Sequence, residues 1–190
     1  MDGPFEAQES YRIKRPFWSI FERTFRIVAP DDRLIMLVRH PIWKLREEFT
    51  VWADEARSRP LLQIKARQLI AINFSFDVSD ASTGRVLGSV QKQGLRSLVR
   101  DKFLILDAGG VEIGHMEEQG ASLLRRFVPL LPSKHAVFVG GVQVASVRQI
   151  FRFFTKEFDV ALAHSTLDPR FVLACALLAV MAEARREDRN

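Results

Sequence analysis

The stretch LDPRFVLACALLAVMAEARRED, residues 167–188, determines how the rest of the chain has to fold. Between Phe171 and Ala182 its only polar side chain is the thiol of Cys175. Asp168 can cap the first free N–H groups of a helix, and Pro169 suits the first helical position. The stretch therefore predicts a helix that begins near Pro169 and is apolar on every side.

The apolar part of this helix is too short to cross a membrane. Its twelve residues cover roughly 18 Å at about 1.5 Å per residue, whereas the hydrocarbon core of a bilayer is about 30 Å thick. Asp168 and Pro169 block extension on one side, and the charged residues from Glu183 onward block it on the other. A helix that is apolar all round must then be enclosed by protein, and we expect Cys175 to be a small core residue.

Most of the preceding chain has the alternating pattern of half-buried strands. EFTVWAD (48–54), LLQIKARQ (61–68) and NFSFDVSD (73–80) place apolar residues at every second position, which is typical of strands with one face toward a core. HAVFVGGVQVASV (135–147) predicts a hairpin, because paired glycines suit a tight turn. Further strands are predicted at 11–15, 18–21, 25–29, 34–39, 85–92, 103–107, 111–116 and 154–161.

These strands and the apolar helix together predict a mainly β fold. Short spacings with turn residues between strands favour a continuous antiparallel sheet. A barrel of about twelve strands is too wide for side chains alone to fill, so we expect it to enclose the C-terminal α-helix. A short extra helix is predicted near 120–127. A similar order of strands and turns in residues 25–67 and 76–118 favours repeated meanders.

Length, charge and cysteine content restrict the class of protein. The 190 residues fit a flexible tail at 1–10, one barrel domain at 11–184 and a charged tail at 185–190. The net charge of +5 permits loose attraction to anionic surfaces. One cysteine excludes an internal disulfide and a cysteine-based zinc site. The N-terminus has no secretory signal, so we expect a cytoplasmic protein, peripheral at the membrane.

Three stretches resemble the tubby C-terminal-like superfamily, in particular its phospholipid scramblases and LURP-one-related proteins. They are FDVSDASTGRVLGSVQKQGLRSLVRDKFLILDAGGVEIGHMEE (76–118), HAVFVGGVQVASVRQ (135–149) and LDPRFVLACALLAVMAE (167–183). The resemblance implies a twelve-stranded barrel around a hydrophobic C-terminal helix. It also implies a binding module, since tubby binds phosphoinositides through basic residues on the barrel surface. The palmitoylated cysteine cluster and the acidic calcium segment of eukaryotic scramblases are not matched here.

The residues that could carry chemistry favour a protein that is not an enzyme and binds no metal or cofactor. The four histidines, His40, His115, His135 and His164, have no ligand spacing. Asp54, Asp80 and Asp107 follow strands, where they are better explained as turn residues than as paired catalytic carboxylates. GGVEIG (109–114) has neither phosphate-loop nor dinucleotide-binding spacing.

The best candidates for a functional site are basic clusters. KQGLRSLVRDK (92–102) contains Lys92, Arg96, Arg100 and Lys102, and SLLRRFVPLLP (122–132) contains Arg125 and Arg126. RIKRPFW (12–18) adds a third cluster. Cations beside apolar side chains suit a membrane interface, where they meet anionic headgroups, although solvated strand faces and connectors are the simpler explanation of any single cluster.

Three functions are therefore open. The first is a non-enzymatic module that contacts anionic phospholipid headgroups or a membrane surface through Lys92, Arg96, Arg100, Lys102, Arg125 and Arg126. The second is a protein-interaction or structural barrel with a protein partner and no lipid affinity, and the third is a phospholipid scramblase. We expect no nucleic-acid partner, because the basic residues are dispersed, and no transmembrane span.

Overall fold

The computed structural model describes residues 9–16, 22–41, 48–70, 73–92, 102–119, 132–150, 152 and 155–187. Within these ranges the chain forms strands β1 to β12 followed by helix α1. In chain order they are β1 Ser10–Pro16, β2 Glu22–Val28, β3 Leu34–Pro41, β4 Glu48–Trp52, β5 Pro60–Ile70, β6 Asn73–Asp80, β7 Val86–Lys92, β8 Lys102–Leu106, β9 Glu112–Glu118, β10 Lys134–Val139, β11 Val142–Ile150, β12 Thr155–Leu162 and α1 Pro169–Glu187.

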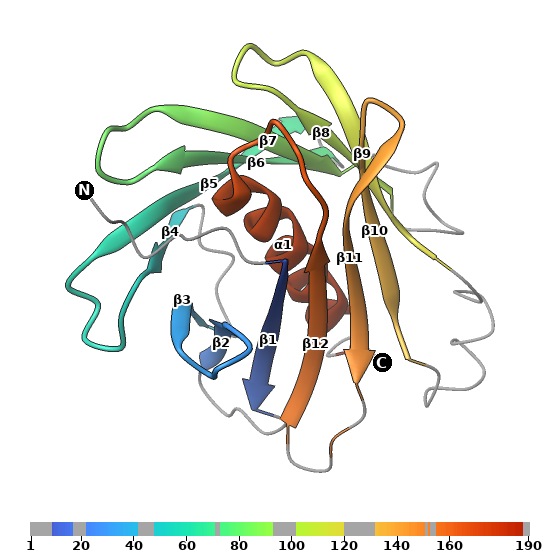
Figure 1. The fold of residues 1–190 in the computed structure, drawn as a ribbon. Helices are drawn as coiled ribbons and strands as arrows, with labels where there is room; N and C mark the ends of the chain where they lie inside the picture. Colours follow the sequence, from blue (N-terminus) through green and yellow to red (C-terminus); the bar gives the residue numbers. More distant parts are fainter. Residues whose placement is uncertain are drawn as a thin grey trace.

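The strands form one closed barrel in which sequence neighbours pair with each other and β1 pairs with β12. All of the pairings are antiparallel, and Figure 1 shows α1 lying inside the ring of strands. The predicted antiparallel barrel around a C-terminal helix is therefore confirmed. The predicted strand at 18–21 and the predicted short helix near 120–127 lie outside the described residues. α1 continues to Glu187, beyond residue 184, where the sequence analysis ended the domain.

The helix is the central part of the core. Every residue from Phe171 to Met181 is buried, including Cys175, which is 1% exposed. The strands contribute alternate residues to the same cluster, such as Phe49 and Val51 of β4. Among the described residues, α1 does not combine the length and apolar character that a membrane-spanning helix needs. Enclosure by the sheet explains why the helix has no polar face.

One glycine shows how closely the helix approaches the wall. Gly88 in β7 faces the ring of Phe171, and a Cβ at this position would collide with the ring and, at 2.6 Å, with the carbonyl oxygen of Leu106. Only a residue without a side chain fits between the helix and the strand here. Gly88 therefore lets the first turn of α1 pack directly on β7.

The predicted internal repetition takes the form of two similar four-stranded meanders, β2 to β5 and β6 to β9. Their first turns are closed in a similar way, by a 2.9 Å hydrogen bond from the Ala29 amide to the Arg33 carbonyl and by one of the same length from the Asp80 amide to the Arg85 carbonyl. Each turn also has one residue with a positive φ, Asp32 at 63° and Gly84 at 72°. The second turn is one residue longer than the first, so the two meanders are alike in order but not identical in their turns.

The two ends of the barrel are connected differently. At one end, which we call the turn end, the strands are joined through residues 29–33, 53–59, 81–85, 107–111 and 140–141, and residues 163–168 lead into α1. At the other, the connector end, the strand ends are joined through residues 17–21, 42–47, 71–72, 93–101, 120–131 and 151–154. Because the strands alternate in direction around the whole barrel, every connector starts and finishes at the same end.

Candidate anion-binding surface

Two of the six basic residues predicted from the sequence are placed by the structure. Lys92 is the last residue of β7 and Lys102 is the first of β8, so both lie at the connector end. Lys92 is opposite the buried Phe103, and Lys102 is opposite Glu117. Residues directly opposite each other point to the same face of a sheet, so Lys92 is directed toward the barrel interior and Lys102 toward the outside.

Arg96, Arg100, Arg125 and Arg126 lie outside the described residues. The strand ends that carry their segments are placed, however: residues 93–101 join Lys92 to Lys102, and residues 120–131 join Gln119 to Pro132. β7, β8, β9 and β10 are consecutive neighbours in the barrel. Both predicted clusters are therefore tied to one sector of the connector end.

The composition of the chain differs strongly between the two ends. The six connectors contain seven Lys or Arg residues and two acidic residues, together with two of the three Trp and six of the fifteen Phe. The segments at the turn end contain six acidic residues, four Arg, and no aromatic residue except His164. The strand ends that flank these sequence-distant basic and aromatic segments thus all lie at one end of the barrel.

The third basic cluster, at the N-terminus, is neutralised by acidic neighbours. Arg12 contacts Asp159 at 3.3 Å, and Lys14 contacts Asp32 at 2.7 Å. The hydrogen bond from Lys14 holds the pKa of Asp32 below its usual value. Arg15 is only 5% exposed. These contacts make the N-terminal cluster part of the strand surface, which agrees with the simpler of the two interpretations of its sequence.

Sequence reasoning missed a second pair of cations at the connector end. Lys134 in β10 lies directly opposite Arg148 in β11, and both side chains are exposed. On the next strand, β12, Asp159 lies opposite Arg148. On β1, the strand after that, Arg12 lies opposite Asp159. We call Lys134, Arg148, Asp159 and Arg12 the cationic row. Figure 1 shows that its strands β10, β11, β12 and β1 lie side by side.

A buried hydrogen bond joins the barrel wall to the last part of α1. The Nε2 atom of His135 lies 3.3 Å from Oε2 of Glu183, and both side chains are almost fully buried. His135 is the second residue of β10 and points inward. His115 stacks on Phe138 with 5.1 Å between ring centroids. In the part of the chain that the structure describes, no group of three potential ligands could hold a metal ion.

The three aspartates that follow strands are turn residues, as the sequence predicted. Asp54 accepts hydrogen bonds from the amides of Ser58 and Arg59, and Asp107 accepts them from Gly109 and Val111. Asp80 does the same for Ser82 and Thr83. Such bonds satisfy backbone donors within a tight turn, so these carboxylates have a structural explanation.

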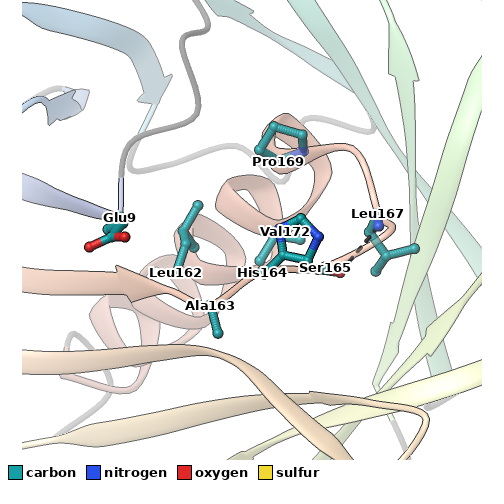
Figure 2. A pocket seen from close by; sticks show the side chains of 8 residues that line it. All are labelled: Glu9, Leu162, Ala163, His164, Ser165, Leu167, Pro169 and Val172. Atoms are coloured by element: carbon teal, nitrogen blue, oxygen red, sulfur yellow. Dashed lines mark hydrogen bonds between the residues drawn. The ribbon is translucent and has the colours of Figure 1, made fainter.

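A pocket of about 430 Å³ lies at the turn end, beside the start of α1. Figure 2 shows His164 lying over Val172 in its centre, with Leu162, Leu167 and Pro169 around it. The amide of Leu167 donates a 3.1 Å hydrogen bond to Ser165 on one wall. The pocket has no lysine or arginine and has a carboxylate, that of Glu9, at its edge, so it does not suit an anion.

Comparisons of the chain with protein-family models, with characterised proteins and with solved structures found no match.

Proposed function

We propose that this protein is a non-enzymatic binding module of the scramblase and tubby-like class that contacts anionic phospholipid at a membrane surface. The proposed contacts are Arg96, Arg100, Lys102, Arg125 and Arg126; Lys92, which the sequence also suggested, is directed toward the barrel interior and is not among them. The observation that carries the proposal is that the strand ends flanking all six connectors, four of which contain Lys or Arg, lie at one end of the barrel. The barrel around a hydrophobic helix agrees with the fold that the sequence resemblance implies.

The physical basis is the combination of residue types at the connector end. Lys and Arg gain about 1 kcal/mol each near an anionic surface, while Trp and Phe favour the boundary between headgroups and acyl chains. The connectors contain both kinds of residue, and the turn-end segments have an excess of acidic residues. An approach with the connector end toward the membrane places the basic segments at the headgroups and the acidic turns in water. The protein then acts in the cytoplasm as a peripheral membrane protein.

Co-sedimentation with vesicles tests this proposal. Wild-type protein should bind vesicles of phosphatidylcholine with phosphatidylserine, and binding should weaken as salt is added. Vesicles of phosphatidylcholine alone should bind much less. Equal binding to both kinds of vesicle, or binding to neither, contradicts the proposal.

Three matched double variants locate the contact on the molecule. R96E/R100E and R125E/R126E should each reduce binding to acidic vesicles. R33E/R59E makes the same change of charge at the turn end, where both arginines are exposed, and should bind like the wild type. An equal loss in all three variants would indicate a response to net charge, and the assignment to the connector end would then be wrong.

A protein-interaction barrel is the second candidate, and exposed apolar residues at the turn end favour it. Val111 is 62% exposed and Val142 is 64% exposed. Their turns are adjacent, because the Gly140 amide donates a 2.9 Å hydrogen bond to the Ile113 carbonyl. A stoichiometric protein partner that is lost in V111S/V142S, together with no affinity for acidic vesicles, would favour this function. Transfer of labelled lipid between leaflets by the purified protein would instead indicate a scramblase.

A further inference from the structure

We infer that Lys134 and Arg148 form an oxyanion site that binds a phosphate group. The inference rests on the proposed function, and it names a contact residue pair and a ligand group that the sequence did not indicate. Both residues lie in the described part of the chain, on the outer face of β10 and β11. Lys134 and Arg148 belong to strands, whereas Arg96, Arg100, Arg125 and Arg126 belong to the segments between strands.

The geometry of the pair is the first argument. Side chains directly opposite each other on antiparallel strands have Cβ atoms about 5 Å apart. Lys134 and Arg148 occupy such positions, while their neighbours His135 and Val147 point into the barrel. Long, flexible cationic side chains that start this close can both reach one tetrahedral anion. Arg also offers several N–H donors in a planar arrangement that matches phosphate oxygens.

The second argument is electrostatic. Like charges directly opposite each other destabilise a strand pair, and within the described residues neither Lys134 nor Arg148 has an ion pair or a side-chain hydrogen bond. The one carboxylate in the row, Asp159, accepts a 3.3 Å hydrogen bond from Arg12. Arg12 also contacts Glu157 at 3.9 Å, so within the described residues Lys134 and Arg148 are the two cations of the row without an ion pair. An anion between them would remove their repulsion.

The third argument is the position of Gln119, which lies on the β9 side of Lys134. The Gln119 amide donates a 2.7 Å hydrogen bond to the Lys134 carbonyl, which places Gln119 beside Lys134 at the end of β9. The side-chain amide of Gln can donate hydrogen bonds without adding charge. Gln119, next to Lys134, can thus donate a further hydrogen bond to an anion. Asp159, next to Arg148, already accepts a hydrogen bond from Arg12.

The test uses K134Q/R148Q together with a control that removes the same charge elsewhere. K65Q/R67Q is suitable because Lys65 is also exposed on a strand but lies opposite Glu48 and Asp77. Removing Lys134 and Arg148 relieves repulsion, so K134Q/R148Q should unfold at or above the wild-type temperature. K65Q/R67Q loses the contact of Arg67 with Asp77 at 2.6 Å, so its unfolding temperature is measured as well, and binding is compared at a temperature at which all three proteins are folded.

The first measurement is an amide chemical-shift titration with inorganic phosphate, with chloride at equal ionic strength as reference. Phosphate should shift the amides around Lys134 and Arg148 in the wild type and in K65Q/R67Q. The shifts should be absent in K134Q/R148Q. Shifts that persist in K134Q/R148Q, or no response in the wild type, would overturn the inference.

The second measurement is binding to vesicles of phosphatidylcholine with phosphatidic acid, which presents the same group as a lipid headgroup. Affinity should fall roughly fivefold for each cation removed and about 25-fold in K134Q/R148Q. A loss no larger than that of K65Q/R67Q rules out the pair as a lipid contact. If R96E/R100E and R125E/R126E lose vesicle binding but K134Q/R148Q does not, the inference fails and the proposed function stands. If phosphate binds at the pair but no vesicle does, the site is one for free phosphate and the proposed function fails.

Discussion

Arg170, in the first turn of α1, is bonded to Asp80 at the end of β6, with 2.6 Å between Nη1 and Oδ2. The same guanidinium donates to the helix cap Asp168, with Nη2 lying 2.7 Å from Oδ2. The residues are partly buried: the side chains of Arg170 and Asp80 are 21% and 10% exposed. This contact fixes the start of the enclosed helix to the β6–β7 turn, ninety positions earlier in the chain.

Replacement of Arg170 by Met should destabilise the protein by about 2–3 kcal/mol, because a partly buried carboxylate loses a charged hydrogen-bond donor. In a chain of this size that corresponds to a fall of roughly 5–10 °C in Tm. Thermal unfolding followed by circular dichroism measures it. K14Q is the control: Lys14 also bonds to an aspartate, Asp32, but Asp32 is 68% exposed, so the loss of stability should be much smaller than in R170M. Equal losses in the two variants would show that Arg170 has no special role.

The same contact predicts a dependence on pH. The hydrogen bond from the Ser82 hydroxyl lowers the pKa of Asp80, and the hydrogen bond from Arg170 lowers it further. Burial acts in the opposite direction, but the hydrogen bonds outweigh it. The pKa of Asp80 is therefore far below its value of 3.8 in an unfolded chain. The unfolded chain therefore binds a proton first as pH falls, and the stabilisation by Asp80 decreases progressively below about pH 4. Above that range it is fully present.

The variant D80N removes this titration. Urea unfolding at pH 7, 5, 4 and 3 should show a large stability difference between wild type and D80N at pH 7 and 5. The difference should shrink at pH 4 and 3, because the wild type then loses the stabilisation by ionised Asp80, which D80N lacks at every pH. A difference that stays constant over the whole range would mean that Asp80 does not titrate with a lowered pKa.

Gly88 should tolerate no side chain. A Cβ there meets the Phe171 ring and the Leu106 carbonyl oxygen, so G88A should cost about 2–3 kcal/mol through overpacking. Urea unfolding measures the loss. G109A is the control, since its nearest obstacle is the movable carboxylate of Asp107 at 3.3 Å, and it should change stability by less than about 1 kcal/mol.

A second variant identifies the obstacle. F171L replaces the ring by a smaller side chain, and the double variant G88A/F171L should be less destabilised than the sum of the two single variants. Additive effects would show that the ring of Phe171 is not what Gly88 accommodates.

The barrel could be predicted from the sequence because its signals are local. Alternation in segments such as 48–54 identified strands one at a time, and the apolar run after Asp168 required an enclosure. The aspartates that cap turns were also identified correctly, since their hydrogen bonds reach only a few residues along the chain. The contact of Arg170 with Asp80 was not predictable, because no local pattern relates a helix start to a turn so far away.

The register of β10 and β11 shows why the cationic row was missed. Val139 lies opposite Val142 next to the Gly140-Gly141 turn, and counting outward from that pair would place Lys134 opposite Val147. A bulge between Val137 and Phe138 shifts the pairing by one residue, so Arg148 lies opposite Lys134 instead. A one-residue shift changes which face each side chain occupies. Recognising the site required the observed register.

Enclosure of α1 makes a final prediction about Cys175. Burial raises the pKa of the thiol to about 12, and only the thiolate reacts quickly with disulfide reagents. The native protein at pH 8 should therefore react with Ellman's reagent only as fast as it unfolds, and reaction should become immediate in urea. Because G88A destabilises the packing around the same helix, it should label faster than wild type, while G109A should not. Rapid labelling of the native wild type would mean that α1 is accessible to solvent and that the sheet does not enclose it.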